Sequence, residues 1–502
     1  MVNSSGAPID MLVIGGGING LGIARDAAGR GLGTLVCERG DLAGATSSAS
    51  TKLVHGGLRY LEHYEFRLVR EALAEREVLL RLAPHLIRPL RFIMPHDRHL
   101  RPNWMIRAGL FLYDHLGGRR SLPASSAVDL RHDAVGVPLR PEYAKGFAYS
   151  DCWVDDARLV VANALDLRRL GGKVLTRTAV TAAARNGKLW QVSLRDQRNG
   201  ATRTVSARLV VNAAGPWVGQ VLAQVFGLSL ARDIILVKGS HIVVPRLFDG
   251  EHAYIFQHPD RRVIFAIPYE ERFTLVGTTD ITVSGDPGTS HIEPDEIEYL
   301  CQAVNRYFVR QTTPADVIWR YSGVRPLYDD GTSDPSAITR DYVLALDAPP
   351  DAAPLLNIFG GKITTYRRLA EHALDKIAPL FPGLKGPWTR ATPLPGGDID
   401  GTGMAEFRDR LRREFAALDP ALLDDYAGRY GSRTRALLAG ATAMADLGRD
   451  FGARLYAREV QWLMREEWAE TAEDVLWRRT KRGLHLPASG AAALAAWMAQ
   501  QN

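Results

Sequence analysis

Cysteine is scarce in this sequence, which has three among 502 residues: Cys37, Cys152 and Cys301. They lie far apart and form no C-x-x-C pair, so neither a disulfide framework nor a zinc site is expected, and we expect no metal ion. Such sparse cysteine is typical of a protein from a reducing compartment, and we expect a cytoplasmic location.

Long hydrophobic runs are also absent. A membrane-spanning helix needs about 20 apolar residues, and the run from Met11 to Ile14 is far too short. The N-terminal stretch MVNSSGAPIDMLVIGGGING lacks the basic start and the small-residue cleavage site of a signal peptide. Hydrophobic residues make up 46% and charged residues 24% of the chain, as in ordinary globular proteins, and the length predicts two or three domains.

Lysine supplies only nine of the 62 cationic side chains, so the net charge of +6 comes mostly from arginine. The segment from Arg88 to Arg120 holds seven arginines against two aspartates, and within it residues 104–113 read WMIRAGLFLY. Such a segment suits the interface of an anionic membrane, with its rings among acyl chains and its arginines on lipid phosphates. A core helix is the alternative. Nucleic acid could bind a basic patch, but no nucleic-acid motif accompanies it, and we expect no such partner.

A βαβ unit is predicted near the N-terminus. Its parts are a strand from Asp10 to Ile14, a glycine-rich turn from Gly15 to Gly22, a helix from Ile23 to Arg30 and a strand from Thr34 to Glu38. This order of elements is that of a dinucleotide-binding fold.

The turn of this unit carries the G-x-G-x-x-G spacing at Gly15, Gly17 and Gly20. These glycines allow the tight turn, the approach of the backbone to a pyrophosphate, and close packing of the helix. Glu38 ends the second strand, where it is placed to accept hydrogen bonds from an adenosine ribose. The unit therefore predicts a dinucleotide site.

Further elements are predicted along the chain. Residues 66–82 should form a helix, and another should run from about Pro294 to Arg310. A hairpin turn is expected at 269–272, within a series of strand-like stretches: KVLTRTAV, LWQVSLRD, TRTVSARLVVNAAG, IILVKGSHIVVP, RVIFAIP and FTLVGTTDI. Residues 400–502 read as helices, with a capping box at Thr471–Asp474 and a helix stop at Gly483.

Two more glycine-bearing turns follow strands. VVNAAGPWV places Ala214 and Gly215 after one strand, and NIFGGKITT places Gly361, Lys362 and Thr364 before a helix. Small residues there let the chain approach a cofactor closely. Three such turns spread over 350 residues suit a tightly held FAD better than an exchangeable NAD. The polar loop between the first and second turns adds Thr46, Ser47 and His55 as cofactor-binding candidates.

The chain resembles the FAD-dependent, quinone-linked glycerol-3-phosphate dehydrogenases. The matching stretches lie between residue 12 and about 376, with a further match around EEWAETAEDVLWRRTKRG. They include IGGGINGLGIARDAAGRGL, ATSSASTKLVHGGLRYLEHYEFRLVREALAERE, YSDCWVDDARLVVANA, VVNAAGPWV, KGSHIVVP, GTTD, YSGVRPL, AITRDY and FGGKITTYRRLAEHAL.

The resemblance implies a D-amino-acid-oxidase-like fold of class α/β plus α, in which a Rossmann-like FAD domain is interleaved with a β-rich substrate domain and an all-helical C-terminal domain follows. The FAD domain is expected to be discontinuous, over residues 1–75, 150–230 and 325–390. The substrate- and membrane-facing domain is expected over 76–149 and 231–324, and the helical domain over 391–502.

The resemblance also implies oxidation of sn-glycerol 3-phosphate to dihydroxyacetone phosphate by hydride transfer to the flavin. A buried phosphate dianion requires cations and hydroxyl donors, and guanidinium groups suit it best. The substrate-binding candidates are Arg59, Tyr60, Thr278, Arg325, Arg340 and Lys362.

The proton of the substrate hydroxyl needs a base, and three catalytic candidates stay open. His241 is the natural base at neutral pH. Arg325 could stabilise the developing alkoxide by its charge, and Lys362 is a third candidate that would also stabilise negative charge on the reduced ring.

The resemblance implies a membrane quinone as electron acceptor, so we expect a peripheral protein on the inner face of the cell membrane. Two alternatives are a soluble oxidase that passes electrons to oxygen and an amine or amino-acid oxidase of the same fold. The role of the C-terminal domain stays open and includes the formation of a homodimer.

Overall fold

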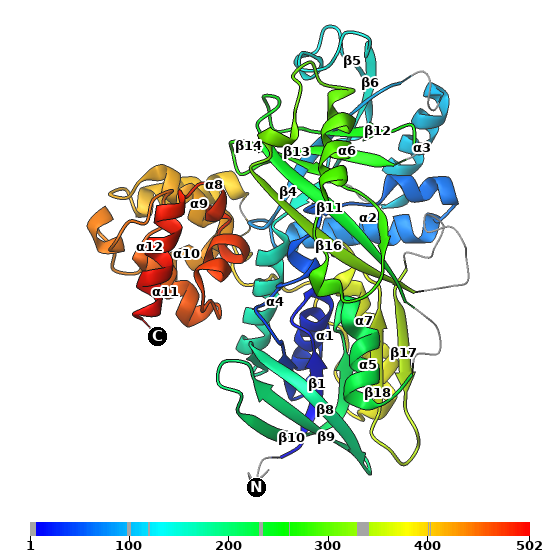
Figure 1. The fold of residues 1–502 in the computed structure, drawn as a ribbon, viewed down its shortest axis with the longest axis vertical. Helices are drawn as coiled ribbons and strands as arrows, with labels where there is room; N and C mark the ends of the chain where they lie inside the picture. Colours follow the sequence, from blue (N-terminus) through cyan, green and yellow to red (C-terminus); the bar gives the residue numbers. More distant parts are fainter. Residues whose placement is uncertain are drawn as a thin grey trace.

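The computed structural model describes residues 7–97, 102–118, 121–229, 234–260, 262–328, 341–399, 401 and 403–501. Two large sheets make the body of the molecule, and a helical domain packs at its side (Figure 1). This is the expected arrangement of an α/β unit interleaved with a β-rich unit and followed by helices. Among the described residues, no helix is both long and apolar enough to cross a bilayer.

The first sheet has the strand order β17-β18-β10-β1-β2-β7. These strands are Val343–Asp347, Leu355–Phe359, Thr202–Asn212, Ile9–Ile14, Thr34–Cys37 and Lys173–Leu175. β1 pairs in parallel with both β2 and β10, so the carboxyl ends of three strands meet at one edge, where ligands bind in such sheets.

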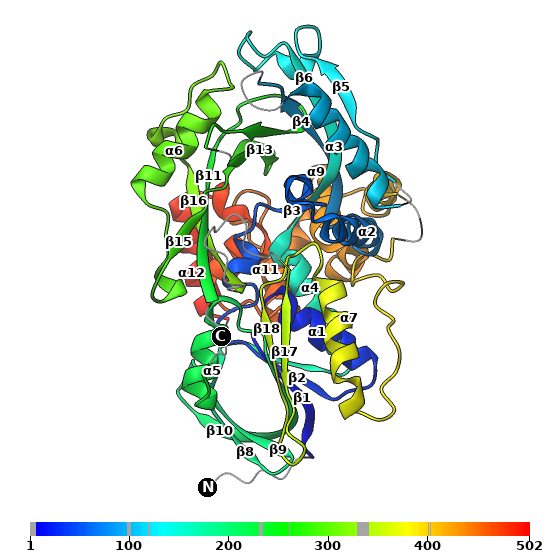
Figure 2. The ribbon, with the colours of Figure 1, turned by 90° about the vertical axis from the view of Figure 1, so that its right-hand side faces the viewer.

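Both faces of the first sheet are covered, which explains the continuous apolar run of β1. Met11 and Val13 pack towards the helices α1 (Ile18–Gly29), α4 (Asp156–Arg169) and α7 (Tyr366–Ile377). Leu12 and Ile14 pack on the opposite face, beneath α5 (Val218–Phe226) and the hairpin of β8 (Thr178–Asn186) and β9 (Leu189–Asp196) (Figure 2).

The expected start of the first helix was wrong. α1 begins at Ile18, not at Ile23, because the turn needs only Gly15 to Gly17. Gly20 and Gly22 lie inside the helix for reasons of packing: a Cβ on Gly20 would lie 2.1 Å from the carbonyl oxygen of Gly15, and one on Gly22 would lie 2.7 Å from the Tyr366 ring. Glycines that serve helix packing resemble turn glycines in the sequence.

The second sheet has the order β15-β11-β14-β13-β12-β4-β6-β3, with β16 on β11 and β5 on β6. In that order the strands are Ile281–Val283, Ile234–Pro245, Phe273–Gly277, Val263–Tyr269, Ala253–Gln257, Ile87–Pro95, Lys145–Val154 and Leu53–Val54; β16 is Trp319–Tyr328 and β5 is Ser126–Asp129. The hairpin expected at residues 269–272 joins β13 to β14 and is confirmed.

Helices cover both faces of this sheet as well. One face packs against α6 (Pro294–Asn305) and the other against α2 (Phe66–Leu82) and α3 (Asn103–Leu116). α2 has the bounds predicted from its pattern. α6 ends at Asn305, before the expected Arg310, because the Asn305 side chain bonds both the N–H and the carbonyl oxygen of Thr312 and turns the chain away.

The chain crosses between the sheets near the expected domain boundaries, but not at them. β6 stays paired with β4 as far as Val154, so the crossing follows that residue and not residue 150. β3 belongs to the second sheet although it lies within the stretch 1–75, and β16 continues past residue 325 to Tyr328. Long continuous pairing places each crossing at the end of a strand.

The C-terminal domain has its own core. Its helices are α8 (Met404–Glu414), α9 (Pro420–Tyr430), α10 (Thr434–Leu437), α11 (Ala457–Glu466), a π-helix (Asp474–Arg479) and α12 (Ala488–Ala499). The cap is confirmed, since the Asp474 carboxylate accepts from Thr471 N–H and the Thr471 hydroxyl accepts from Asp474 N–H. The stop at Gly483 was wrong: the π-helix ends at Arg479, and Gly483 lies in a 3₁₀ turn.

Candidate functional site

A cavity of about 1010 Å³ lies where the two sheets meet. This volume is at the upper end of what small-molecule sites require, enough for a large cofactor with a substrate beside it. Its walls bring together fifteen of the residues singled out in the sequence: Gly15, Gly17, Glu38, Thr46, Ser47, His55, Tyr60, Ala214, Gly215, His241, Thr278, Arg325, Gly361, Lys362 and Thr364.

The glycine-rich turn makes one wall of the cavity. Gly15 has φ +114°, in the region that favours glycine, and a Cβ there would lie 2.5 Å from the Ala213 carbonyl oxygen. Gly17 lines the cavity and precedes the first helical residue, so the N-terminus of α1 faces the open space. Gly20 does not line the cavity, because it packs on Gly15 and fixes the turn from behind.

Glu38 holds the loop that follows β2. Its carboxylate accepts hydrogen bonds from Gly16 N–H and Gly40 N–H, each at 2.7 Å. Burial raises the pKa of Glu38, in spite of these two donors. The remaining lone pairs suit the hydroxyl groups of an adenosine ribose, so this loop would form the adenosine end of the cavity.

The Ser/Thr-rich loop is tied to both sheets. The Ser47 hydroxyl accepts from Ile18 N–H at 3.0 Å and so caps α1 from outside the helix. The Thr46 hydroxyl donates to the carbonyl oxygen of Val324 on β16 at 2.7 Å. Below the loop, Lys52 is fully buried, with Nζ 2.9 Å from both carboxylate oxygens of Asp156. No local pattern in the sequence predicted this pair.

The third glycine-bearing turn meets the first across the cavity. Asn19 Nδ2 donates to the Gly360 carbonyl oxygen at 3.0 Å, and a Cβ on Gly361 would lie 2.6 Å from the same Nδ2. His55 N–H donates to the Thr364 hydroxyl at 3.2 Å. Within the part of the chain that the structure describes, the buried Oδ1 of Asn19 has no hydrogen-bond partner, as expected of a wall that a polar cofactor completes.

His241 reaches the cavity from the middle of β11. Its Nε2 lies 2.9 Å from the Thr51 hydroxyl, and its ring stacks on Tyr321 at 4.8 Å between centroids. Gly277 lies opposite on β14, and a Cβ there would lie 2.1 Å from the ring, so glycine makes the space for the histidine. The buried Nδ1 of His241 has no hydrogen-bond partner among the described residues.

Burial, together with the positive charges of Lys52 and Arg325, lowers the pKa of His241 to about 3. The imidazole is therefore neutral near pH 7 and has a lone pair with which to accept a proton. A dianion bound nearby would add negative charge and raise this pKa, which makes the histidine a better base in the complex than in the free protein.

Thr278 and Arg325 lie on either side of Gly239. A Cβ at that glycine would lie 2.7 Å from Thr278 Oγ1 and 3.1 Å from an Nη2 of Arg325. Arg325 forms an ion pair with Asp280, and its side chain keeps 35% of its surface exposed. β11 pairs antiparallel with β16, and Arg325 lies opposite Val237. Because alternate residues of a strand share a face, Gly239, His241 and Arg325 lie on the same face of the sheet.

Lys362 and Tyr60 form a second group at the cavity wall. The ammonium nitrogen of Lys362 lies 4.0 Å from the centroid of the Tyr60 ring, a cation–π contact. Arg59 precedes Tyr60 in a 3₁₀ helix but does not line the cavity. Arg340 lies outside the described residues, so its predicted role stays a prediction.

Sequence reasoning missed several residues of the cavity wall. Asn19 and Thr51 stand beside recognised motifs, and hydrogen-bonding side chains next to glycine-rich turns are a signal that could have found them. Arg39 covers the Trp217 ring at 4.2 Å, and both residues line the cavity. Other additions come from β8, the end of β9, α5 and the helical domain, among them Thr178, Ala179, Val180, Thr181, Arg195, Gln197, Gln220, Val221, Gln224, Glu473 and Arg478.

Comparisons with known proteins cover the whole chain. Residues 10–367 match the family described as FAD dependent oxidoreductase, and residues 387–500 match the C-terminal domain of alpha-glycerophosphate oxidase. The chain is 53% identical over 491 residues to the aerobic glycerol-3-phosphate dehydrogenase of Escherichia coli (strain K12), with 98% of this chain and 97% of that protein covered. It is 52% identical over 493 residues to the D-erythritol 1-phosphate dehydrogenase of Brucella abortus (strain 2308), with 98% of each covered.

A solved structure has the same fold. The glycerol-3-phosphate dehydrogenase from Bacillus halodurans, determined in complex with FAD, matches with a TM-score of 0.79 at 29% identity. The match covers 99% of this chain and 91% of that one. It therefore includes the two sheets and the helical domain together.

Proposed function

Because the chain belongs to the family of FAD-dependent glycerol-3-phosphate dehydrogenases, we propose that it oxidises sn-glycerol 3-phosphate to dihydroxyacetone phosphate. The family, the fold and FAD as cofactor, all expected from the sequence, are confirmed by these matches. The observation that carries the proposal for the substrate is the cavity wall, where a neutral histidine, two cations and two hydroxyl groups face the same space.

Cations and hydroxyl groups of the cavity wall would bind the phosphate of the substrate. Arg325 and Lys362 would hold the phosphate dianion, and the hydroxyl groups of Tyr60 and Thr278 would donate to its oxygens. The ion pair with Asp280 would keep the guanidinium of Arg325 oriented before the phosphate dianion binds. This charge balance favours a dianion over the single carboxylate of an amino acid.

His241 would accept the proton of the C2 hydroxyl. It is neutral, and its Nε2 is held by Thr51, which fixes the orientation of the ring. When bound, FAD supplies the acceptor for the hydride from C2. Arg325 would stabilise the negative charge that develops on the C2 oxygen, and Lys362 would lie beside the reduced ring.

A four-carbon polyol phosphate is the second candidate substrate. The identity to the D-erythritol 1-phosphate dehydrogenase, 52%, equals that to the glycerol-3-phosphate enzyme within a percentage point. Both substrates join a phosphate to a secondary alcohol, so the same cations and the same base would serve either. The cavity volume leaves room for the extra carbon.

An anaerobic titration tests the proposal. Purified holoenzyme is mixed without oxygen with sn-glycerol 3-phosphate, D-erythritol 1-phosphate, glycine or sarcosine, and the flavin absorbance is followed. We expect fast bleaching with the three-carbon phosphate, and at least tenfold slower bleaching with each other compound. Bleaching by D-erythritol 1-phosphate alone would replace the first candidate with the second, and bleaching by glycine or sarcosine alone would refute both.

For the electron acceptor we propose a membrane quinone, reached from the inner face of the cell membrane. The support is the outer face of α3, where large apolar side chains stand in solvent: Trp104 is 69% and Phe111 is 61% exposed, and Met105 and Leu112 are also exposed. The opposite face of α3 packs Ile106, Leu110 and Tyr113 into the core. Figure 1 places α3 at the outer edge of the β-rich half.

Vesicle binding and electron transfer test this second proposal. The protein should sediment with anionic phospholipid vesicles, and Phe111→Asp should release it. Ile318→Asp is the matched control, because Ile318 is also an exposed large apolar residue, at 52%, but lies immediately before β16 and not on α3. Equal sedimentation of both variants would count against α3, and stoichiometric hydrogen peroxide without quinone reduction would favour the soluble oxidase. Homodimer formation stays a prediction, which the mass of the protein in solution tests.

A further inference from the structure

The C-terminal helical domain forms part of the wall of the FAD cavity. Glu473 and Arg478, both from this domain, line the cavity together with Glu38 and Gly40. Glu473 immediately precedes the π-helix Asp474–Arg479, and Arg478 is the next-to-last residue of that helix. The helical domain, which the sequence predicted as a separate unit, therefore reaches the end of the cavity that would hold the adenosine.

Asp41 is the anchor on the cofactor side. Its buried carboxylate receives two hydrogen bonds from Arg479, at 2.7 and 2.8 Å, and one from Arg478 Nε at 2.5 Å. Asp41 follows Glu38 and Gly40 in the loop after β2, and Ala43 N–H of the same loop donates to the Gly16 carbonyl oxygen at 3.2 Å. The loop thus joins two arginines of the helical domain directly to the glycine-rich turn.

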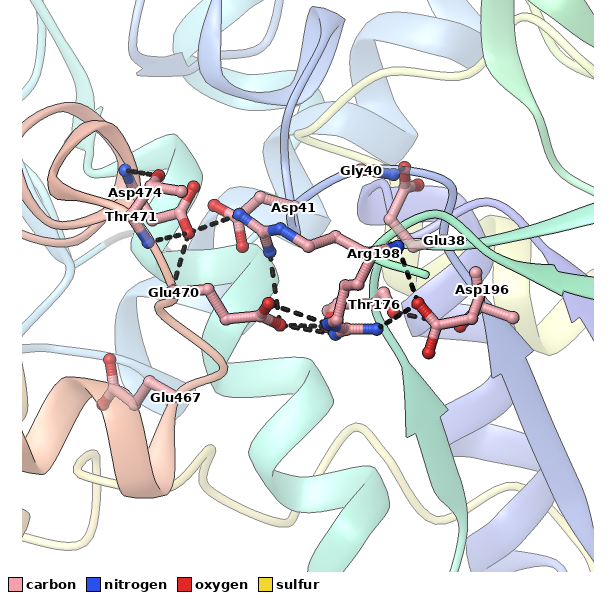
Figure 3. A network of polar contacts seen from close by, with 12 residues as sticks. Glu38, Gly40, Asp41, Thr176, Asp196, Arg198, Glu467, Glu470, Thr471 and Asp474 are labelled. Atoms are coloured by element: carbon pink, nitrogen blue, oxygen red, sulfur yellow. Dashed lines mark hydrogen bonds and ion pairs between the residues drawn. The ribbon is translucent and has the colours of Figure 1, made fainter. Parts of the chain in front are cut away.

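A second set of contacts, shown in Figure 3, also joins the body of the molecule to the helical domain. Asp474 accepts from Arg177 at 2.7 Å, and Arg177 N–H donates to the Gly40 carbonyl oxygen at 2.8 Å. Arg198 holds Glu470 through two hydrogen bonds, at 2.5 and 2.8 Å. These contacts join the β8–β9 region to the helical domain just outside the cavity.

We propose that the C-terminal domain retains FAD: Arg478 and Asp41 are positioning residues that close the adenosine end of the cavity, so docking of the domain and binding of FAD stabilise each other. Arg478 reaches three carboxylates, those of Asp41, Glu473 and Asp474, while its side chain forms cavity wall. Loss of these contacts of Arg478 would weaken the hold on the loop that carries Glu38. By linkage, bound FAD must strengthen docking as much as docking strengthens binding.

The test is the rate at which FAD leaves the holoenzyme. Flavin fluorescence, which rises on release, is followed after dilution of wild type, Arg478→Gln and Arg478→Lys. Loss of charge-assisted hydrogen bonds at the cavity wall should make release from Arg478→Gln about tenfold faster. Arg478→Lys, which keeps the charge but not the fork, should fall between it and wild type.

Arg168→Gln is the matched control. Arg168 on α4 pairs with Glu466 at 2.9 Å, so it also joins the body to the helical domain, but neither residue lines the cavity. Its FAD release should stay within twofold of wild type. A wild-type rate in either Arg478 variant, or equal acceleration in Arg168→Gln, would overturn the proposal. Asp41 keeps its two bonds from Arg479 in these variants, and if Arg478→Gln is insoluble, Arg478→Lys decides alone.

This inference rests on FAD binding and not on the identity of the substrate. The release measurement contains no substrate, so its outcome is independent of the anaerobic titration. Thermal unfolding of each variant, followed by circular dichroism, shows whether the helical domain is still folded. A purely structural role for Arg478 would lower the unfolding temperature without changing FAD release at temperatures below the transition.

Discussion

The buried pair of Lys52 and Asp156 offers the sharpest test of how the cavity is supported. Both side chains are fully buried, and Lys52 Nζ also donates to the Ser48 carbonyl oxygen at 3.0 Å. Lys52→Met keeps most of the volume of the side chain but removes the charge. Asp156 would keep the Ser50 hydroxyl at 2.7 Å and Ala157 N–H at 2.8 Å as its donors.

The expected cost is large, because breaking a buried pair leaves an uncompensated charge. Such losses run to about 3–5 kcal/mol, which corresponds to a fall of roughly 5–10 °C in the unfolding midpoint. FAD content should fall too, because the loop above the pair carries Thr46 and Ser47 at the cavity wall.

The free energy of unfolding should depend on pH differently in wild type and in Lys52→Met. Burial raises the pKa of Asp156, but the charges of Lys52 and Lys481 and the hydrogen bonds from Lys52 and Ser50 outweigh it, so the pKa lies below its usual range. In wild type this contribution is therefore complete above pH 4 and constant from pH 5 to 8. Without Lys52 its charge and its hydrogen bonds are lost, and we expect burial to outweigh the charge of Lys481 and the hydrogen bond from Ser50 that remain, which raises the pKa. The variant should then gain stability as pH falls, and its deficit should be larger at pH 8 than at pH 5.

Thermal unfolding of wild type and Lys52→Met at pH 5 and pH 8, followed by flavin fluorescence, measures both effects. The control is Lys52→Met combined with Asp156→Asn, which removes the charge that the single variant leaves unpaired and should recover at least half of the loss. An unfolding midpoint for Lys52→Met within 2 °C of wild type would refute the reasoning, as would a deficit that is larger at pH 5.

Three further predictions concern the cavity itself. Gly20→Ala should yield protein without flavin absorbance, because the new Cβ would lie 2.1 Å from the Gly15 carbonyl oxygen; full flavin content would show that α1 can shift. Thr51→Val should lower kcat about tenfold with FAD content unchanged, since it removes the hydrogen bond to His241 Nε2; a KM effect alone would contradict this. His241→Gln should lower kcat about 100-fold. Because the pKa of His241 is about 3 in the free protein, wild type and this variant should have kcat/KM profiles of the same shape from pH 5 to 8, and an inflection present only in wild type would count against that value.

The sequence predicted those parts of the site whose chemistry is local. Gly15 and Gly361 have positive φ values, a local backbone requirement that favours glycine. Gly17 and Glu38 were predicted from their places in the βαβ unit, which needs no knowledge of the rest of the fold. The start of α1 was missed because Gly20 looks like a turn residue until the carbonyl oxygen behind it is known.

The sequence did not predict the parts that depend on partners far along the chain. Lys52 meets Asp156 across 104 residues, and Arg478 meets Asp41 across 437. A charged residue in an arginine-rich chain gives no local sign that it will be buried. The matching stretches include both Arg325, in YSGVRPL, and Asp280, in GTTD, but they did not predict that the two side chains form an ion pair.

The division of the cavity between two sheets bears on which polyol phosphate the protein prefers. The first sheet and its turns would face the cofactor. The space for the substrate is set instead by β11 and its neighbours, where a single Cβ at Gly239 would collide with Thr278 and crowd Arg325. A methyl group at that position would reduce the space for the substrate by about the volume of one carbon atom. A preference for three carbons over four should therefore follow from the second sheet, and substitutions confined to β11, β14 and β16 should alter it without loss of FAD.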